Sequence, residues 1–284
     1  MRIRLPGRRT LGTVAVAALA GTLLTQSLSV APSNAAPAAS ADASTGTWAI
    51  DANSHYADKI QERPISGGDE FYIATVGFRS TPGVAGSTDA WFHGGLYEID
   101  DIDKHETHSI NDRMGRVEFT NVEQRGVLDL LVGRNPELIG TLSVVFESDS
   151  TPFRIINGMM RDMASSAEEE IAALVEPLSL TEINAAALSD QFQAAAGRIK
   201  DSVMPNTREK IRIALASLGD PDDLIDYKVN LFAAADPALG TIVGPALASA
   251  VPAEVGVAGV LEPREYSQRF EGDGARYDIS FSVD

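Results

Sequence analysis

The sequence predicts an exported α+β protein: a mainly antiparallel β-sandwich-like domain with an inserted block of three or four helices. Three observations predict this fold. Strand-like segments recur between turn signals in residues 48–150, the apolar period becomes helical in residues 151–218, and strand-like patterns return in residues 219–284. Strands and helices that are grouped in this way, rather than alternating, are typical of the α+β class.

The first 35 residues are expected to be a signal peptide that is removed on export, which makes the mature protein secreted. Four arginines before residue 10 precede an uncharged apolar stretch over residues 10–24. Ser33-Asn34-Ala35 then fits the small-x-small rule for cleavage. Residues 36–47 are expected to be a flexible linker, and residues 48–284 are expected to form a single exported domain.

Residues 48–150 contain the first group of expected strands. The segment 69–79 alternates and is rich in aromatic and β-branched residues, which indicates a strand. Turn signals such as Thr81-Pro82-Gly83 separate the segments from one another. The further strands expected in this group are 90–99, 116–122, 127–132 and 140–147.

Residues 151–218 contain the expected helices. Ser166–Glu169 and Ser179–Glu182 match the capping box that starts a helix, and Asn206 with Glu209 is a third, less complete match. The second of these helices has one apolar face, and Pro205 is expected to end it. We expect amphipathic helices that pack together or on the sheet.

Strands are expected again after residue 219, at 227–232, 254–261, 265–271 and 276–284. The last segment alternates most regularly, with Tyr277, Ile279, Phe281 and Val283 on one side. A strand at the very end of the chain indicates that the C-terminus belongs to the sheet. The helical block is therefore expected to be an insertion within one domain.

The charge and the absence of cysteine exclude several classes of function. Removal of residues 1–35 takes away four arginines and no acid, so the net charge goes from −17 to −21. Such a surface disfavours nucleic acid, whose phosphates need clustered Lys and Arg, and it also disfavours anionic membranes. A chain without cysteine has no thiolate catalysis, thiolate zinc site or iron–sulfur cluster.

Four aspartates before an expected strand form the first candidate metal site. Asp220, Asp222, Asp223 and Asp226 offer hard oxygen ligands within one turn, which suits Ca²⁺. Acidic side chains of the turn 271–274 could complete the set if that turn lay alongside. Asp and Pro are also ordinary turn residues. The first interpretation is therefore a turn that starts a strand, and the second is a calcium loop.

A second candidate metal cluster lies in residues 100–112. Asp101, Asp103 and His105 follow the spacing of the first ligands of an EF-hand. Glu106, however, stands where the sharp turn of that loop requires Gly, so the segment is not an EF-hand. These three residues are alternative metal ligands, and an exposed acidic loop with two incidental histidines is the preferred interpretation.

The segment 238–261 is the most unusual stretch of the chain. It consists of small apolar residues, is interrupted by Pro245 and Pro252, and has Glu254 as its only charge. A membrane hairpin, a buried strand–loop–strand and a helix packed against the sheet are all consistent with it. The two prolines and the absence of Trp and Tyr anchors argue against a membrane-spanning helix.

No catalytic motif is present. There is no G-x-S-x-G elbow and no Gly-rich phosphate loop. We therefore expect a secreted acidic binding protein, with Ca²⁺ as its candidate ion and a protein, a glycan or a cell surface as its partner. Two alternatives stay open: a membrane-active, toxin-like protein that uses the helical block and residues 238–261, and a secreted hydrolase with an unrecognised site.

Overall fold

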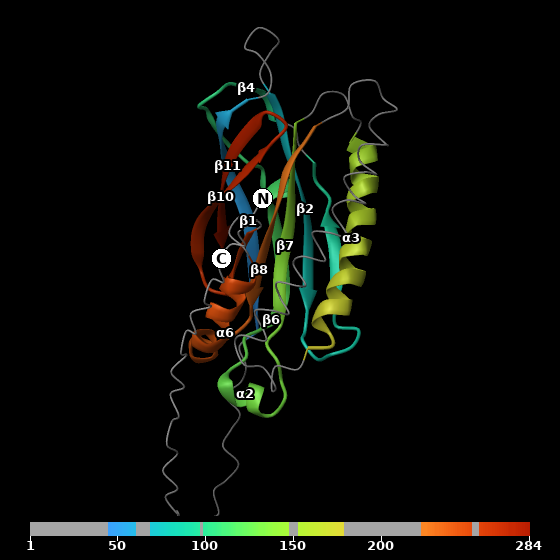
Figure 1. Ribbon diagram of the computed structural model, residues 1–284, viewed down its shortest axis with the longest axis vertical. Coiled ribbons are helices and arrows are strands. Elements are labelled where there is room, and N and C mark those ends of the chain that lie inside the picture. The colour runs from blue at the N-terminus through green and yellow to red at the C-terminus, as the bar shows by residue number, and fades with distance from the viewer. Residues whose placement is uncertain (1–44, 61–68, 97–98, 148–152, 179–222, 252–255) are drawn as a thin grey trace, which may run out of the picture. The chain divides into compact units, whose positions relative to one another are not determined.

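The computed structural model describes residues 45–60, 69–96, 99–147, 153–178, 223–251 and 256–284, all within the compact unit Asp42–Asp284 (Figure 1). This part of the chain is mainly β, with two sheets, A and B, whose strands pair mostly antiparallel, and with few helices. The two sheets share a buried core, and we call this pair of sheets the sandwich. The first strand starts at Thr45, so the end of the predicted linker already belongs to a sheet.

Sheet A has five strands, with β1 at its centre. On one side β1 pairs with β11, which pairs with β10; on its other side β1 pairs first with β6 and then with β5. All of these pairs are antiparallel. The strands are β1 (Thr45–Lys59), β5 (Thr107–Ser109), β6 (Arg116–Glu123), β10 (Arg264–Gly272) and β11 (Ala275–Val283).

Sheet B has six strands, in the order β3-β2-β7-β8-β9, with β4 also paired to β2. Its one parallel pair among the described strands is β8 with β9. A parallel pair needs a crossover connection, and helix α6 supplies part of it. The strands are β2 (Asp69–Ser80), β3 (Asp89–His93), β4 (Ile99–Ile102), β7 (Leu138–Glu147), β8 (Asp223–Ala233) and β9 (Gly256–Val260).

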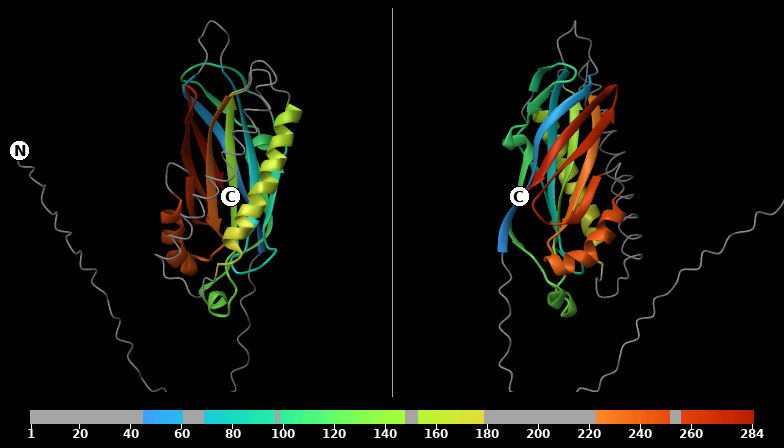
Figure 2. Two further views of the ribbon diagram at one scale, coloured as in Figure 1. Left: turned by 45° about the vertical axis from the view of Figure 1, so that its right-hand side comes forward. Right: turned by 90° about the vertical axis from the view of Figure 1, so that its left-hand side faces the viewer.

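Four helices accompany the strands in the described part of the chain. They are α1 (Asp112–Gly115), α2 (Val127–Leu131), α3 (Phe153–Val175) and α6 (Pro237–Ala250). The helix α3 packs on β2 and β3, and α6 packs on β8 and β9, so both cover the face of sheet B that points away from sheet A (Figure 2). The two layers of apolar contact therefore lie between the sheets and under these helices.

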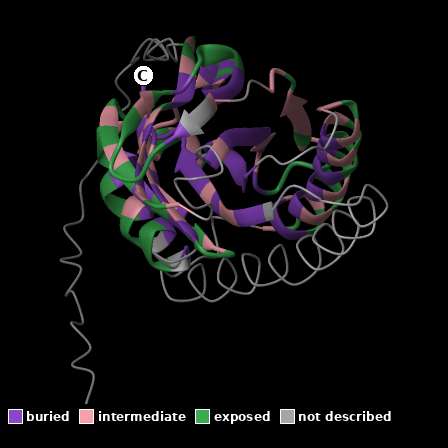
Figure 3. Cartoon of the chain, turned by 90° about the horizontal axis from the view of Figure 1, so that it is seen from above, coloured by how far each residue is buried: buried purple, intermediate pink, exposed green. Residues whose placement is uncertain are grey.

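The core between the sheets follows from the alternation of side chains along the strands. In β11 every second residue from Ala275 to Val283 is buried, as the sequence pattern predicts. Phe71 and Ile73 of β2 face these side chains from sheet B. Figure 3 shows the buried residues concentrated where the two sheets face each other.

Two of the predicted strands need correction. The segment 127–132 is not a strand: Val127–Leu131 form the short helix α2, because the Asp129 carboxylate accepts a hydrogen bond from the Gly126 N–H (3.1 Å) and closes the first turn. The segment 90–99 is not one strand, since β3 ends at His93 and pairing resumes only at Ile99. A short apolar run is compatible with either a strand or a helix, so the sequence pattern could not decide the first case.

The helix predicted to start at Ser166 starts earlier. The helix α3 is continuous over 23 residues, and Ser166 lies in its interior. Ile156 and Met160, in the turns before Ser166, are buried in the core. Most helical stability in proteins comes from packing of an apolar face, and this outweighs the local capping signal. The later helices predicted in 151–218 lie outside the described residues.

The apolar segment 238–261 forms α6 and then β9. Asp236 caps α6 by accepting a hydrogen bond from the Leu239 N–H (2.7 Å), and Leu239, Val243 and Leu247 are buried against sheet B. Of the three alternatives for this segment, a helix packed against the sheet describes its first half, and the strand predicted at 254–261 is confirmed as β9.

Candidate functional site

The sandwich has two ends with different chemistry. At the α2 end, β2 finishes next to the start of β7, and β8 finishes beside them, because Ser80 pairs with Leu138 and Leu138 pairs with Ala233. At the β4 end, β2 begins beside β4, because Asp69 pairs with Ile102. The strand β7 ends there as well, because its last residue, Glu147, pairs with Phe71. Figure 1 shows α2 and β4 at these opposite ends.

The α2 loop, residues 126–136, folds around one carboxylate. The Asp129 carboxylate caps the first turn of α2. The backbone carbonyl of the same residue accepts a hydrogen bond from the Arg134 N–H (2.8 Å). Gly133 follows with a φ of 79°, a conformation that a residue with a side chain rarely adopts. This compact turn leaves no residue of α2 buried.

Three apolar side chains of the α2 loop point into solvent, whereas Val127 and Leu130 pack against the core. Leu128 is 78% exposed, Leu131 is 74% exposed and Val132 is 71% exposed. In the described part of the chain only two other large apolar side chains are exposed, Val84 at 48% and Ile242 at 56%. Val84 lies in the β2–β3 turn and Ile242 lies in the first half of α6.

Hydrogen bonds hold these three elements together at the α2 end. The Asn135 side-chain amide donates to the Pro82 carbonyl (2.6 Å), which joins the α2 loop to the β2–β3 turn. The Asp236 N–H donates to the Arg125 carbonyl (2.8 Å), which joins the start of α6 to the residue before the loop. All five exposed large apolar side chains of the described part therefore belong to one end of the sandwich.

The α2 end is also poor in charge. Charged residues make up 22% of the chain, yet residues 80–88 and α6 contain none, and the α2 loop contains only Asp129 and Arg134. Asp129 is turned toward the loop's own backbone and lies within 3.9 Å of Arg125 and 3.7 Å of Arg134. Arg134 has the more exposed side chain of the two. Acids flank these segments, because Glu176 accepts hydrogen bonds from the β2–β3 turn and Glu262, just after β9, is 64% exposed. Within the α2 loop itself, the exposed apolar side chains lie beside one well-exposed cation, Arg134.

The β4 end holds a buried histidine. The ring of His55 stacks on Phe71 (centroids 4.1 Å apart) and on His108 (5.5 Å), and neither ring nitrogen has a hydrogen-bond partner among the described residues. The side chain is fully buried. Burial, and then the positive charge of His108, lower the pKa of His55 to about 3. The ring is therefore neutral at ordinary pH.

A buried tyrosine and two buried acids adjoin this histidine. The Tyr277 hydroxyl donates to the Asp69 carboxylate (2.7 Å), and the two aromatic rings of Tyr277 and His55 meet edge to face at 5.8 Å. Glu147, in register with Phe71, is also buried. Burial raises the pKa of Tyr277, and the charge of Asp69 raises it further, so the hydroxyl stays protonated.

The rim of the β4 end carries two exposed polar pairs. His108 contacts the Glu106 carboxylate (3.1 Å), and His105 shares a hydrogen bond with the Tyr56 hydroxyl (2.9 Å). The Asp103 N–H and then His108 stabilise the charged form of Glu106, so its pKa lies below the ordinary value. The rim is thus a set of paired polar groups over a closed aromatic core.

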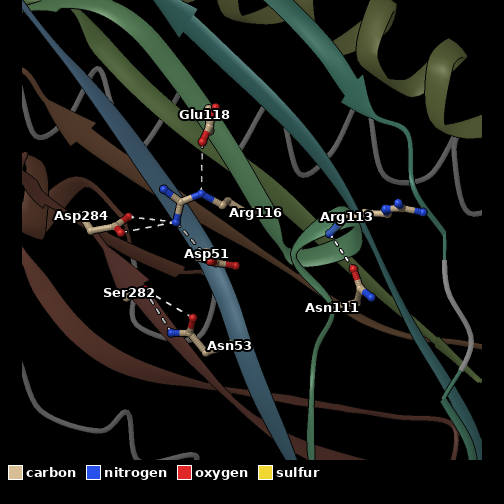
Figure 4. Close-up of polar contacts among 8 residues, drawn as sticks. All are labelled: Asp51, Asn53, Asn111, Arg113, Arg116, Glu118, Ser282 and Asp284. Carbon is tan, nitrogen blue, oxygen red and sulfur yellow. Dashed lines mark hydrogen bonds and ion pairs between the residues drawn. The ribbon is translucent and has the colours of Figure 1, made fainter.

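Figure 4 shows a third polar cluster, on the outer face of sheet A. The Arg116 guanidinium lies 3.3 Å from carboxylate oxygens of Asp51, Glu118 and Asp284. Burial raises the pKa of Asp51, although the bond from Arg116 opposes this. The cluster ties β6, β1 and the residue after β11 together, and it joins the C-terminus to sheet A.

The first predicted metal site is only partly within the described residues. Asp220 and Asp222 lie outside them, and Asp223 starts β8. Asp226 lies 2.7 Å from the Lys228 ammonium and accepts a hydrogen bond from the Glu271 N–H (3.3 Å). The turn 271–274 does lie alongside, as the calcium hypothesis requires.

The carboxylates near Asp226 are nevertheless engaged with cations of the protein. The Glu271 carboxylate accepts a hydrogen bond from the Arg276 guanidinium (2.6 Å). Among the residues that the structure describes, no group of three or more His, Asp or Glu side chains is placed to hold a metal ion. The calcium site stays a prediction that depends on Asp220 and Asp222.

The residues of the second predicted cluster belong to different elements. Asp101 belongs to β4, Asp103 is an exposed residue of the turn after it, and His105 contacts Tyr56. His108 lies in β5, opposite His55, rather than in a loop. The sequence pattern did not predict that these two histidines would lie opposite each other on paired strands.

Two sets of residues were therefore not recognised from the sequence. Tyr277 was placed on the buried side of its strand, but its partner Asp69 is far away in the chain and no local pattern connects them. Leu128 and Leu131 stand between two glycines, Gly126 and Gly133, and this spacing was the one available signal for an exposed apolar loop.

Comparison with known proteins finds no matching family model, no matching curated protein and no matching solved structure. Among the described helices, none combines the length and the apolar character needed to span a bilayer.

Proposed function

We propose that the protein is an exported binding protein that attaches to a cell surface through its α2 end. The observation that carries this proposal is the gathering of every large exposed apolar side chain of the described residues at that end, led by Leu128, Leu131 and Val132. Single exposed apolar residues are ordinary. A group of them in a charge-poor region is typical of an interaction site.

The fold itself gains little from these side chains. Full burial of a Leu or Val side chain is worth about 1.5–3 kcal/mol, yet α2 buries none of its residues. Leu128 and Leu131 would obtain that free energy only when another surface covers them. This favours a partner for the α2 end over a structural role.

The groups at the β4 end support binding rather than catalysis. His55 is fully buried, so a substrate could not reach its ring, and the Tyr277 hydroxyl is engaged with Asp69. His105 and His108 each have a polar partner. The hydrolase alternative has no supporting observation among the described residues.

The test uses the mature protein and envelopes of the producing cells. A variant with Leu128→Ser and Leu131→Ser is expected to bind several-fold less in a sedimentation assay than the natural protein. Lys104→Ser, an exposed change at the opposite end, is the matched control and should bind as the natural protein does. Equal binding by all three proteins, or no binding by any of them, would contradict the proposal.

Two finer features belong to the same proposal. Residues 151–218 would form three or four helices that begin with α3, and Ca²⁺ would bind Asp220, Asp222, Asp223 and Asp226 beside the start of β8. Binding to the folded state at ~100 times the Kd raises stability by ~2.7 kcal/mol. A melting temperature that rises with Ca²⁺ but not with Mg²⁺, and not after Asp222→Ala, is the expected result. An equal rise with Mg²⁺ would remove the calcium site.

A further inference from the structure

The shape of the α2 loop indicates what kind of surface it contacts. The helix has five residues, none of them buried, and Figures 1 and 2 show it beyond the ends of the strands. A stable protein–protein interface buries about 800 Å² per partner, which so short a helix cannot supply alone. A small apolar projection suits a soft surface into which it can sink.

The charge at the α2 end points to the same partner. The chain has a net charge of −17, yet of the two charged residues in the α2 loop the acid, Asp129, is turned inward to cap the helix. Arg134 stays 64% exposed beside Leu131 and Val132. The α2 loop therefore presents aliphatic side chains next to an exposed cation, which complements phosphate headgroups.

We propose that the partner of the α2 end is the interface of a phospholipid bilayer, into which Leu128, Leu131 and Val132 insert while Arg134 meets the headgroup phosphates. This inference rests on the proposed function and names the partner of that same site. The protein would lie on the membrane and not span it. Val84 and Ile242, on the adjoining turn and helix, would contact the same bilayer interface or the water layer next to it.

The attachment should be reversible. A few aliphatic side chains bury no more apolar surface than one acyl chain, and a single myristoyl chain gives an association constant on the order of 10⁴ M⁻¹. We therefore expect binding that is visible at high lipid concentration and is lost on dilution. Because the projection is shallow, release of a trapped dye from vesicles is not expected.

The absence of cysteine makes a direct test simple. Leu131→Cys and Lys104→Cys each place a single thiol, at the α2 end and at the β4 end, for an environment-sensitive dye. With vesicles of phosphatidylcholine, and with vesicles that also contain phosphatidylglycerol, emission from position 131 should rise and shift to the blue. Emission from position 104 should stay unchanged.

Two substitutions in the labelled protein check the mechanism. Leu128→Ser should reduce binding to both kinds of vesicle. Arg134→Gln should reduce binding about fivefold for vesicles with phosphatidylglycerol, since a cation near an anionic surface contributes that much, and should change binding to phosphatidylcholine little. An Arg134→Gln variant that binds vesicles with phosphatidylglycerol as well as the unsubstituted protein does would overturn the role of Arg134 in meeting phosphate.

The outcomes separate the lipid proposal from the proposed function. No change at position 131 with either vesicle, while cell envelopes still bind in a way that needs Leu128 and Leu131, would overturn the lipid partner and leave a protein or glycan partner at this end. No binding to vesicles or envelopes would overturn both. Equal changes at positions 131 and 104 would overturn the end-on attachment.

Discussion

The two ends of the sandwich are made from the same strands, yet they place opposite chemistry in contact with water. The α2 end exposes Leu128 and Leu131 and has few charges, whereas the β4 end closes His55 and Tyr277 inside the core under a polar rim. The strands β2 and β7 run through both. The difference arises in the connections, which are a compact turn at one end and the short strands β4 and β5 at the other.

The contrast assigns binding to the side chains at one end of the sandwich and stability of the fold to the side chains at the other. At the α2 end the apolar side chains are available to a partner and contribute little to folding. At the β4 end the unusual groups are buried, so they affect the free energy of unfolding and its dependence on pH. Variants at the two ends should therefore change different measurements.

The largest expected effect is at the β4 end. Phe71→Ala should lower the free energy of unfolding by about 3–5 kcal/mol, because it leaves a cavity where Phe71 stacks on His55 and meets Tyr277. Denaturant unfolding of the mature protein measures this. A loss below about 1 kcal/mol would show that the β4 end is not the tightly packed one.

A change of pH should have the next largest effect. The folded pKa of His55 is about 3, against 6.5 for the unfolded chain. Its contribution to stability is therefore intact above pH 6.5 and is lost as the pH falls from 6.5 toward 3, because only the unfolded chain takes up the proton. At pH 5 the loss from His55 should be about 2 kcal/mol.

His55→Phe keeps an aromatic ring beside Phe71 and removes the titration. Its unfolding free energy should fall less between pH 7.5 and pH 5 than that of the natural protein. Tyr277 and His108 contact the same ring, and Asp69 bonds to Tyr277; all three are unchanged in both proteins. His105→Gln, at the exposed rim, is the control and should keep the full acid sensitivity. Parallel pH profiles for the natural protein and His55→Phe would refute the assignment.

The smallest effect on stability should come from the α2 end. Leu131→Ala is the same kind of change as Phe71→Ala, but at an exposed position it should alter the free energy of unfolding by less than about 0.5 kcal/mol. The same denaturant measurement checks it. A loss comparable to that of Phe71→Ala would mean that the Leu131 side chain is packed against the rest of the chain and would remove the basis for a free docking end.

Patterns with a regular period were readable in the sequence. The alternation of Tyr277, Ile279 and Phe281 placed β11 and its buried face, and the grouping of strands predicted a mainly β protein with antiparallel sheets. Both depend only on residues close together in the chain. The acidity and the lack of cysteine likewise needed no structure.

The tertiary structure decided which short segments are helix or strand and which side chains meet. Residues 127–132 could be either, and Val127–Leu131 form the helix α2 with Val127 and Leu130 packed against the core, while Leu128 and Leu131 are exposed. Burial of Ile156 and Met160 extended α3 past the local signal at Ser166. A local pattern specifies only the period of the apolar residues in a segment, because that period depends on neighbours in the chain. It does not specify which distant segments the residues pack against.

The candidate sites depend on contacts between distant segments. His55 meets Phe71 and His108 only because β1 is opposite β2 and beside β5, and Tyr277 reaches Asp69 from the other end of the chain. The sequence by itself determined the net charge of the chain and the presence of sheets with mainly antiparallel strands. Tertiary structure alone decided which apolar side chains stay exposed and which titratable groups are buried, because burial is a property of the whole packed chain.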